Sequence, residues 1–169
     1  MSKSYPEFYA RISAPWRRNP EMAKLVERAD AFLRVAVAGA YAGLLAWLAA
    51  TSSGQLLRAF VVPLVTFGLV TAMRAFVNAR RPYEAHDIAP LIHKDTQGKS
   101  MPSRHMASAT IIACTLLWAA GLLCGTLGFA ACGAIAYLRI VGGVHYPRDI
   151  VAGAGFALLC ALLGYVAIP

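Results

Sequence analysis

The stretch RIVGGVHYPRD, from Arg139 to Asp149, places two arginines, a histidine and an aspartate between two strongly apolar segments. A charged side chain in or beside a membrane span costs several kcal/mol unless it has a partner or faces water. Four such groups in one short stretch therefore indicate a site, and the apolar flanks indicate that this site belongs to a membrane protein. The rest of the sequence must provide the partners of these groups.

The composition of the chain is typical of an integral membrane protein. Of its 169 residues, 59% are hydrophobic and only 14% are charged, whereas a soluble domain of this length needs a larger charged surface. The net charge of +8 would suggest nucleic acid as the partner of a soluble protein. In a membrane protein, basic residues flank spans, contact anionic lipids or bind phosphate. We therefore expect membrane lipids as partners and no nucleic acid.

Five apolar blocks are each close to the length of about 20 residues at which a helix crosses a bilayer. They run over approximately residues 31–50, 57–77, 105–123, 125–141 and 150–168. The short connection TSSGQ and a turn around Gly125 predict antiparallel helix pairs. The predicted fold is all-α, a polytopic transmembrane helical bundle of about five spans that occupies residues 31–169.

Residues 1–30 form a basic segment before the first block. Within it, PEMAKLVERADAFL places Met22, Leu25, Val26 and Ala29 at helical spacing, which predicts an amphipathic helix lying on the membrane surface. A solvated leader into the first span explains the same pattern, so both interpretations stand.

Five spans place the polar segment 78–104 on the same membrane side as the opening stretch. Three clusters of polar residues then meet at one membrane edge. They are RAFVNARRP at residues 74–82, PSRH at residues 102–105 and RIVGGVHYPRD at residues 139–149. Most of the other basic residues also lie on this side, so the positive-inside rule predicts that it faces the cytoplasm.

The clusters have the composition of an anion site. Several arginines that converge on one place need an anion to neutralise them, and guanidinium groups suit phosphate oxygens. Arg74 and Arg81 are seven residues apart, nearly two helical turns, so they can project to one side. Ser103 and Arg104 enter a helix, where free backbone N–H groups and the helix dipole also favour an anion.

The histidines add reactive groups to this anion site. His145 and Asp149 are four residues apart, so a helix that starts near Pro147 would let the carboxylate orient the imidazole. His105 is a second, separate imidazole that can act as a general acid or base. The acidic residues of the polar segment are too scattered to hold a metal ion, so we expect neither a metal nor a cofactor.

These motifs resemble the signature of the type 2 phosphatidic acid phosphatase (PAP2) superfamily, which also includes vanadium haloperoxidases. That signature is a Lys, six residues and Arg-Pro; then Pro-Ser-Gly-His; then Ser-Arg, five residues, His, three residues and Asp. The three clusters match these motifs in order and spacing, over about residues 57–155. The chain departs from the signature at three positions, where Arg74 replaces Lys, Arg104 replaces Gly and Leu138 replaces Ser.

The resemblance implies a role for each matching residue. His145 would attack phosphorus and form a phosphohistidine, and Asp149 would hold the tautomer of His145. His105 would protonate the leaving group and then activate water. The phosphoryl oxygens would be held by Arg74, Arg81, Ser103, Arg139 and the backbone N–H of Arg104.

The resemblance therefore predicts a membrane-embedded, metal-independent phosphatase that hydrolyses a phosphomonoester or pyrophosphate of a lipid. Phosphatidate, phosphatidylglycerophosphate and polyprenyl (pyro)phosphates are candidate substrates. A lipid phosphotransferase with the same site is one alternative. A non-enzymatic membrane haem carrier, with His105 and His145 as axial ligands, is another, although it leaves the arginine spacings unexplained. We expect the bacterial cytoplasmic membrane as the location, and the sequence does not indicate an oligomeric state.

Overall fold

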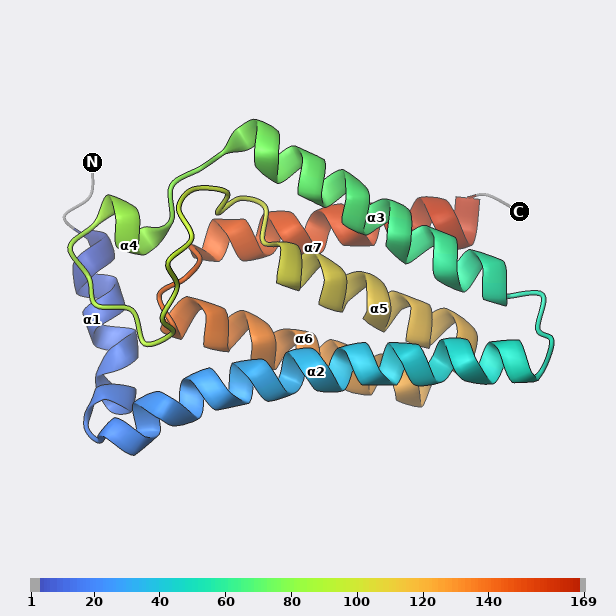
Figure 1. Cartoon of the computed structure of the whole chain (residues 1–169), viewed down its shortest axis with the longest axis horizontal. Coiled ribbons are helices and arrows are strands. Elements are labelled where there is room, and N and C mark those ends of the chain that lie inside the picture. Colours follow the sequence, from blue (N-terminus) through green and yellow to red (C-terminus); the bar gives the residue numbers. More distant parts are fainter. Residues whose placement is uncertain (1–3, 168–169) are drawn as a thin grey trace.

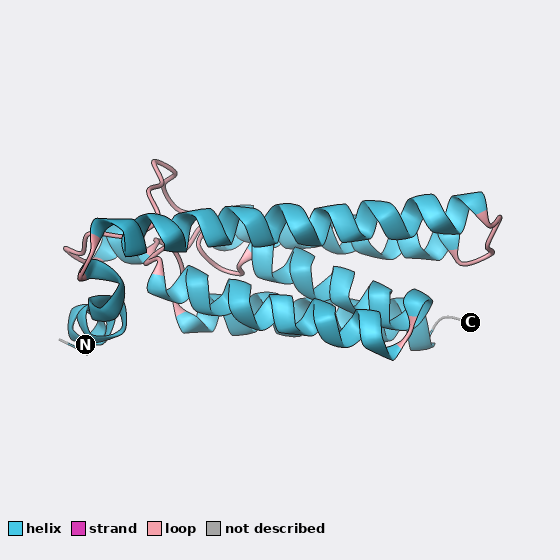
Figure 2. Cartoon of the chain, turned by 90° about the horizontal axis from the view of Figure 1, so that it is seen from below, coloured by secondary structure: helices cyan, strands magenta, loops and turns pink. Residues whose placement is uncertain are grey.

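The computed structural model describes residues 4–167, and every regular element in that range is helical (Figure 1). The elements are α1 (Ser4–Arg17), α2 (Pro20–Ala50), α3 (Leu56–Val77), α4 (Pro82–Ala85), α5 (Arg104–Ala120), α6 (Leu122–Val141), α7 (Pro147–Ala161) and a π-helical stretch (Leu162–Ala167) that continues α7. The long helices run side by side along the molecule (Figure 2). The predicted all-helical bundle is therefore confirmed.

Helix α5 is the centre of the bundle, because it contacts each of α2, α3, α6 and α7 (Figure 1). Its fully buried residues include Ala107 and Ala113, whose small side chains let neighbouring helices approach closely. One core cluster joins α5 to α3 and α7 through Val70, Ile111 and Ala157. The start of α5 is therefore held from several sides, which fixes the position of the PSRH motif.

Four helices are long and apolar enough to cross a membrane, namely α2, α3, α6 and α7 with its π-helical continuation. The central helix α5 has 17 residues, at the short end of the range for a membrane span. The outer faces of the long helices carry exposed apolar side chains such as Phe32, Leu57 and Phe76, as expected for a surface in contact with lipid. The chain is an integral membrane protein with about five spans.

The amino-terminal region differs from the prediction. The residues 20–33 that were expected to form a separate amphipathic helix belong to α2, which continues without a break into the first span. The break lies earlier, where Asn19 caps α2 by accepting a hydrogen bond from the Glu21 backbone N–H at 2.9 Å and Pro20 occupies the first helical position. The separate helix is α1, and it lies across the end of the bundle (Figures 1 and 2).

The turn between α5 and α6 lies at Gly121, not at Gly125 as predicted. Gly121 has φ of +87° and separates the two helices. Gly125 lies inside α6, where a β-carbon would come within 2.5 Å of Leu117 in α5. Close helix packing therefore requires Gly125. The turn was predicted about one helical turn too far along the chain.

Candidate active site

The three motif clusters lie at one end of the bundle, which also carries α1 and α4 (Figure 1). Arg74 lies in the last turn of α3, Arg104 begins α5, Arg139 lies in the last turn of α6, and α7 begins at Pro147. The carboxyl-terminal end of the described chain lies at the opposite end (Figure 1). The predicted meeting of the three clusters on one side is confirmed.

His145 is fully buried and lies beside Asp149, as the spacing predicted. The His145 Nδ1 atom is 3.6 Å from Asp149 Oδ2 and 3.4 Å from the Ser100 hydroxyl. Ser100 Oγ donates to the same carboxylate oxygen at 2.5 Å, and the Tyr146 backbone N–H donates to it at 3.1 Å. The direct His145–Asp149 distance is longer than an ordinary hydrogen bond, so Ser100 bridges the pair. Ser100 lies outside the three sequence motifs and was not predicted as part of the site.

The other ring nitrogen of His145 is free to react. Burial, together with the charges of Arg81 and Arg139, lowers the pKa of His145 to about 4, so the imidazole is neutral at pH 7. Its Nε2 atom is buried and has no hydrogen-bond partner among the described residues. A proton on Nδ1, held by Ser100 and Asp149, leaves the lone pair on Nε2, which is the form that a nucleophile needs.

Arg139 is also fully buried, and its contacts leave one edge of the guanidinium unused. Its Nε atom lies 2.9 Å from Asp30 Oδ1 on α2, while Arg34 Nε donates to Asp30 Oδ2 at 3.0 Å. The Arg139–Asp30 ion pair lacks hydrogen-bond geometry, so Nε, Nη1 and Nη2 of Arg139 and Oδ1 of Asp30 have no hydrogen-bond partner within residues 4–167. Buried guanidinium nitrogens without a hydrogen-bond partner are suited to an anion.

Arg74 and Arg81 reach the site by a different route from the one predicted. Helix α3 ends at Val77, so the two arginines do not share a helix. Arg81 instead lies in the loop after Asn78, where Nε donates to the Gly98 carbonyl at 3.1 Å and Nη1 donates to the Val144 carbonyl at 3.2 Å. Arg74 Nη1 donates to the Pro102 carbonyl at 3.2 Å. Both arginines therefore also fasten the polar loop to the reactive end of the bundle.

The PSRH motif begins helix α5 directly beside α7. The Ser103 backbone N–H donates to the Asp149 carbonyl at 2.9 Å, and the buried Ser103 Oγ has no partner among the residues that the structure describes. A β-carbon on Gly153 would come within 2.5 Å of the Ser103 carbonyl oxygen, so only glycine allows this approach of α7. The buried Nδ1 of His105 is likewise without a partner in the described range.

A cavity of about 390 Å³ opens at this end of the bundle. Its lining includes the predicted residues Arg74, Arg81, Arg104 and His105. It also includes Lys94, which lies outside the three motifs. Burial and the nearby charges of Arg139 and Arg81 lower the pKa of Lys94 to about 8. So many basic groups around one cavity favour an anion there.

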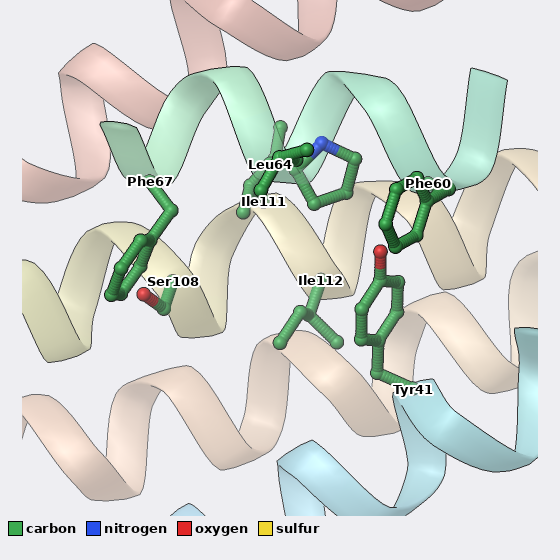
Figure 3. A pocket seen from close by; sticks show the side chains of 8 residues that line it. Tyr41, Phe60, Leu64, Phe67, Ser108, Ile111 and Ile112 are labelled. Carbon is green, nitrogen blue, oxygen red and sulfur yellow. The ribbon is translucent and has the colours of Figure 1, made fainter. Parts of the chain in front are cut away.

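An apolar groove lies between α2, α3 and α5 (Figure 3). The groove has a volume of about 200 Å³ and is lined by Tyr41 of α2, by Phe60, Pro63, Leu64 and Phe67 of α3, and by Ser108, Ile111 and Ile112 of α5. The Arg104 guanidinium, which lines the cavity, lies 5.4 Å from the centroid of the Phe67 ring, which lines the groove. A polar and an apolar binding surface therefore meet at Arg104 and Phe67.

Helix α1 packs against the loop that carries His145. The Tyr5 ring stacks on His86 at a centroid distance of 4.9 Å and meets Tyr146 edge-on at 4.7 Å. The Tyr9 hydroxyl accepts a hydrogen bond from the Leu91 backbone N–H at 3.3 Å.

Residues 4–167 contain no group of three or more His, Cys, Asp or Glu side chains that could hold a metal ion.

Comparisons with known proteins agree with this geometry. The sequence profile of the PAP2 superfamily matches residues 55–169. The fold is similar to the crystal structure of Aquifex aeolicus LpxE, with a TM-score of 0.73, 24% identity, and coverage of 94% of this chain and 92% of that one. It is also similar to a transmembrane PAP2 type phosphatidylglycerolphosphate phosphatase from Bacillus subtilis, with a TM-score of 0.65, 20% identity, and coverage of 96% and 85%. No curated protein sequence matches the chain.

The fold and the family define a membrane enzyme of the phosphatase class. The chain belongs to the PAP2 superfamily, as its three motifs predicted.

Proposed function

We propose that this protein is a metal-independent lipid phosphate phosphatase that works through a phosphohistidine on His145. The observation that carries the proposal is the buried Nε2 of His145, unpartnered in the described structure, at the end of the bundle where the guanidinium of the buried Arg139 also lacks hydrogen-bond partners. The polar cavity and the adjoining apolar groove support a substrate with a phosphate head and a hydrocarbon tail.

The first step transfers the phosphoryl group to the enzyme. His145 Nε2 forms a bond to phosphorus as the bond from phosphorus to the leaving oxygen breaks, and His105 gives its proton to that oxygen. Ser100 and Asp149 hold the Nδ1 proton and stabilise the charge that His145 acquires. The equatorial oxygens are held by Arg74, Arg81, Arg139, Ser103 and the backbone N–H of Arg104.

The second step returns the enzyme to its starting state. His105, now neutral, takes a proton from water as the water oxygen bonds to phosphorus and the bond to Nε2 breaks. Catalysis of this kind relies on positioning and charge stabilisation, so a cage of arginines can take the part that Mg²⁺ has in other phosphoryl-transfer enzymes.

Release of inorganic phosphate tests the proposal. The purified protein, in detergent with a metal chelator, is offered phosphatidate, phosphatidylglycerophosphate, and a polyprenyl phosphate and pyrophosphate. We expect phosphate release from at least one of these lipids, unchanged by the chelator. Failure with every lipid, or loss of activity on chelation, contradicts the proposal.

His105→Ala should slow turnover by about 10²–10⁴-fold, with the larger loss on substrates that leave as poor alkoxides. A poor leaving group needs the proton that His105 supplies, whereas a good one departs without it. Paired esters with a simple alkyl and a nitrophenyl leaving group measure the difference. Equal losses on both would show that His105 is not the general acid.

Leu64→Gln should weaken the use of long-chain lipid phosphates and spare a short, water-soluble phosphate ester. Losing one apolar contact to a tail costs about 1–2 kcal/mol, so we expect KM to rise about tenfold for the long-chain substrate. Leu64 lines the groove (Figure 3). Leu57 lies on the same helix and is also exposed, but it is not part of the groove lining. Leu57→Gln is therefore the matched control. Equal effects on long and short substrates, or on both variants, would remove the groove from tail binding.

The face of the membrane that carries the site is proposed from the distribution of charge. With the cavity residues set aside, the end with α1 still carries exposed basic residues, namely Arg11, Arg17, Arg18, Lys24, Arg28 and Arg80. The positive-inside rule then places this end in the cytoplasm of a bacterial cell.

Cysteine labelling in intact cells should distinguish the two ends. In a background without the four native cysteines, Arg11→Cys and Asp95→Cys lie at the α1 end and Gly54→Cys lies in the opposite turn. We expect an impermeant maleimide to label only the Gly54→Cys variant before the cells are broken. The reverse pattern would overturn the orientation, and labelling of only one of the two α1-end variants would overturn the span count.

A further inference from the structure

Asp30 makes contacts that the PAP2 motifs do not account for. It lies on α2, outside the residues 55–169 that match the family profile, and it is 1% exposed. Each of its carboxylate oxygens faces an arginine, Oδ2 facing Arg34 and Oδ1 facing Arg139. A buried carboxylate between two arginines could simply hold α2 against α6, so its contact with Arg139 decides what else it does.

Asp30 forms an ion pair with Arg139 in which Oδ1 lies 2.9 Å from Nε. A guanidinium group is planar and rigid, so holding Nε in place also fixes the direction of Nη1 and Nη2. All three guanidinium nitrogens of Arg139 are buried without a hydrogen-bond partner in the described chain, and Nε alone has its charge partner, Asp30, at 2.9 Å. Nη1 and Nη2 are therefore available to an anion. Arg34, in contrast, is 40% exposed, and its contact with Asp30 lies within one turn of the same helix. The geometry therefore couples Asp30 to the anion site through one specific arginine.

We propose that Asp30 is a positioning residue, which holds Arg139 so that both of its Nη groups bind phosphoryl oxygens. This inference rests on the proposed function, because it needs Arg139 to bind the phosphoryl group. It brings the amino-terminal part of the chain into the anion site, through a residue on the helix that precedes the first motif.

Asp30→Ala should lower kcat/KM by about 10²-fold, the scale expected when a catalytic contact is misplaced by about 1 Å. Asp30→Asn keeps an oxygen that can accept from Nε, so we expect a loss of less than about tenfold. Glu27→Ala removes a carboxylate from an exposed position three residues earlier on α2 and should leave kcat/KM unchanged. Inhibition by orthovanadate, which imitates the five-coordinate phosphoryl group, should weaken in the same order as kcat/KM.

A double-mutant cycle separates positioning from general destabilisation. In an Arg139→Ala background, Asp30→Ala should have no further effect on kcat/KM, because its only route to the site is gone. If Asp30→Ala lowers kcat/KM by the same factor in both backgrounds, the proposal is overturned. If Asp30→Ala does not fold, the same cycle is run with Asp30→Asn, which keeps a polar side chain beside Arg34 and Arg139.

Vanadate binding tests this inference independently of the proposed function. Orthovanadate bound at the site should raise the melting temperature of the wild-type protein, and this measurement needs no turnover. Loss of protection in Asp30→Ala and in Arg139→Ala, with no further loss in the double variant, supports the inference even if every lipid in the panel is refused. Full protection of Asp30→Ala overturns the inference whether or not the wild type is active.

Discussion

Replacing His145 with alanine is expected to abolish phosphate release and leave the protein folded. His145 supplies the only buried imidazole nitrogen that is held in its nucleophilic form by Ser100 and Asp149, so no other described residue can take its place. Phosphate release is measured with the best substrate of the panel, and the melting temperature in detergent reports the fold. More than about a hundredth of wild-type activity, a loss below about 2.7 kcal/mol, would contradict the assignment.

A trapping experiment examines the same residue directly. Wild-type protein quenched during turnover of a ³²P-labelled lipid should carry label that is stable to alkali and lost in acid, as a phosphorylated imidazole is. His145→Ala should carry none. His93→Ala, in the exposed part of the polar loop, is the matched control and should keep both activity and label.

Asp149→Asn should lower kcat by about 10⁴-fold, the loss known from triads in which the orienting carboxylate becomes an amide. Asp149 Oδ2 accepts from Ser100 and from the Tyr146 backbone N–H and faces His145, and an amide nitrogen in that place would repel all three donors. The measurement is single-turnover phosphate release with excess enzyme.

Two further variants are compared with Asp149→Asn, one at the same site and one as a control. Ser100→Ala removes the bridging hydroxyl but keeps the carboxylate, so we expect a smaller loss of about tenfold. Asp87→Asn makes the same chemical change at an exposed position of the loop and should have no effect. Wild-type turnover by Asp149→Asn would show that the His145 tautomer does not depend on this carboxylate.

The sequence predicts the bundle well because apolar blocks of membrane length can be read locally. The predictions from sequence are wrong where the same local pattern is compatible with two different structures. Gly125 looks like a turn residue, but it serves close packing on Leu117, and the turn is at Gly121. The amphipathic pattern around Val26 looks like a surface helix, yet Val26 is buried because α2 extends beyond the first apolar block to cover α6.

The motif residues of the site could also be predicted, because their spacing is short and characteristic. Arg74 and Arg81 both reach the cavity, although the expected shared helix is absent, because the loop after Asn78 brings Arg81 back. Ser100, Lys94 and Asp30 could not be found in this way. Their partners lie far away in the sequence. The residues around a single serine, lysine or aspartate form no local pattern that predicts a distant contact.

The reactive groups lie together at one end of the bundle, with the carboxyl-terminal end far from them (Figure 1). In a sealed bilayer, each molecule therefore serves a single leaflet. Phosphate leaves into the water on that side, and the dephosphorylated lipid stays in the leaflet where it was made. Vesicles with uniformly oriented protein would stop releasing phosphate once that leaflet is depleted, and further hydrolysis would follow the rate at which substrate flips across. The enzyme would thus create a difference in lipid composition between the two leaflets.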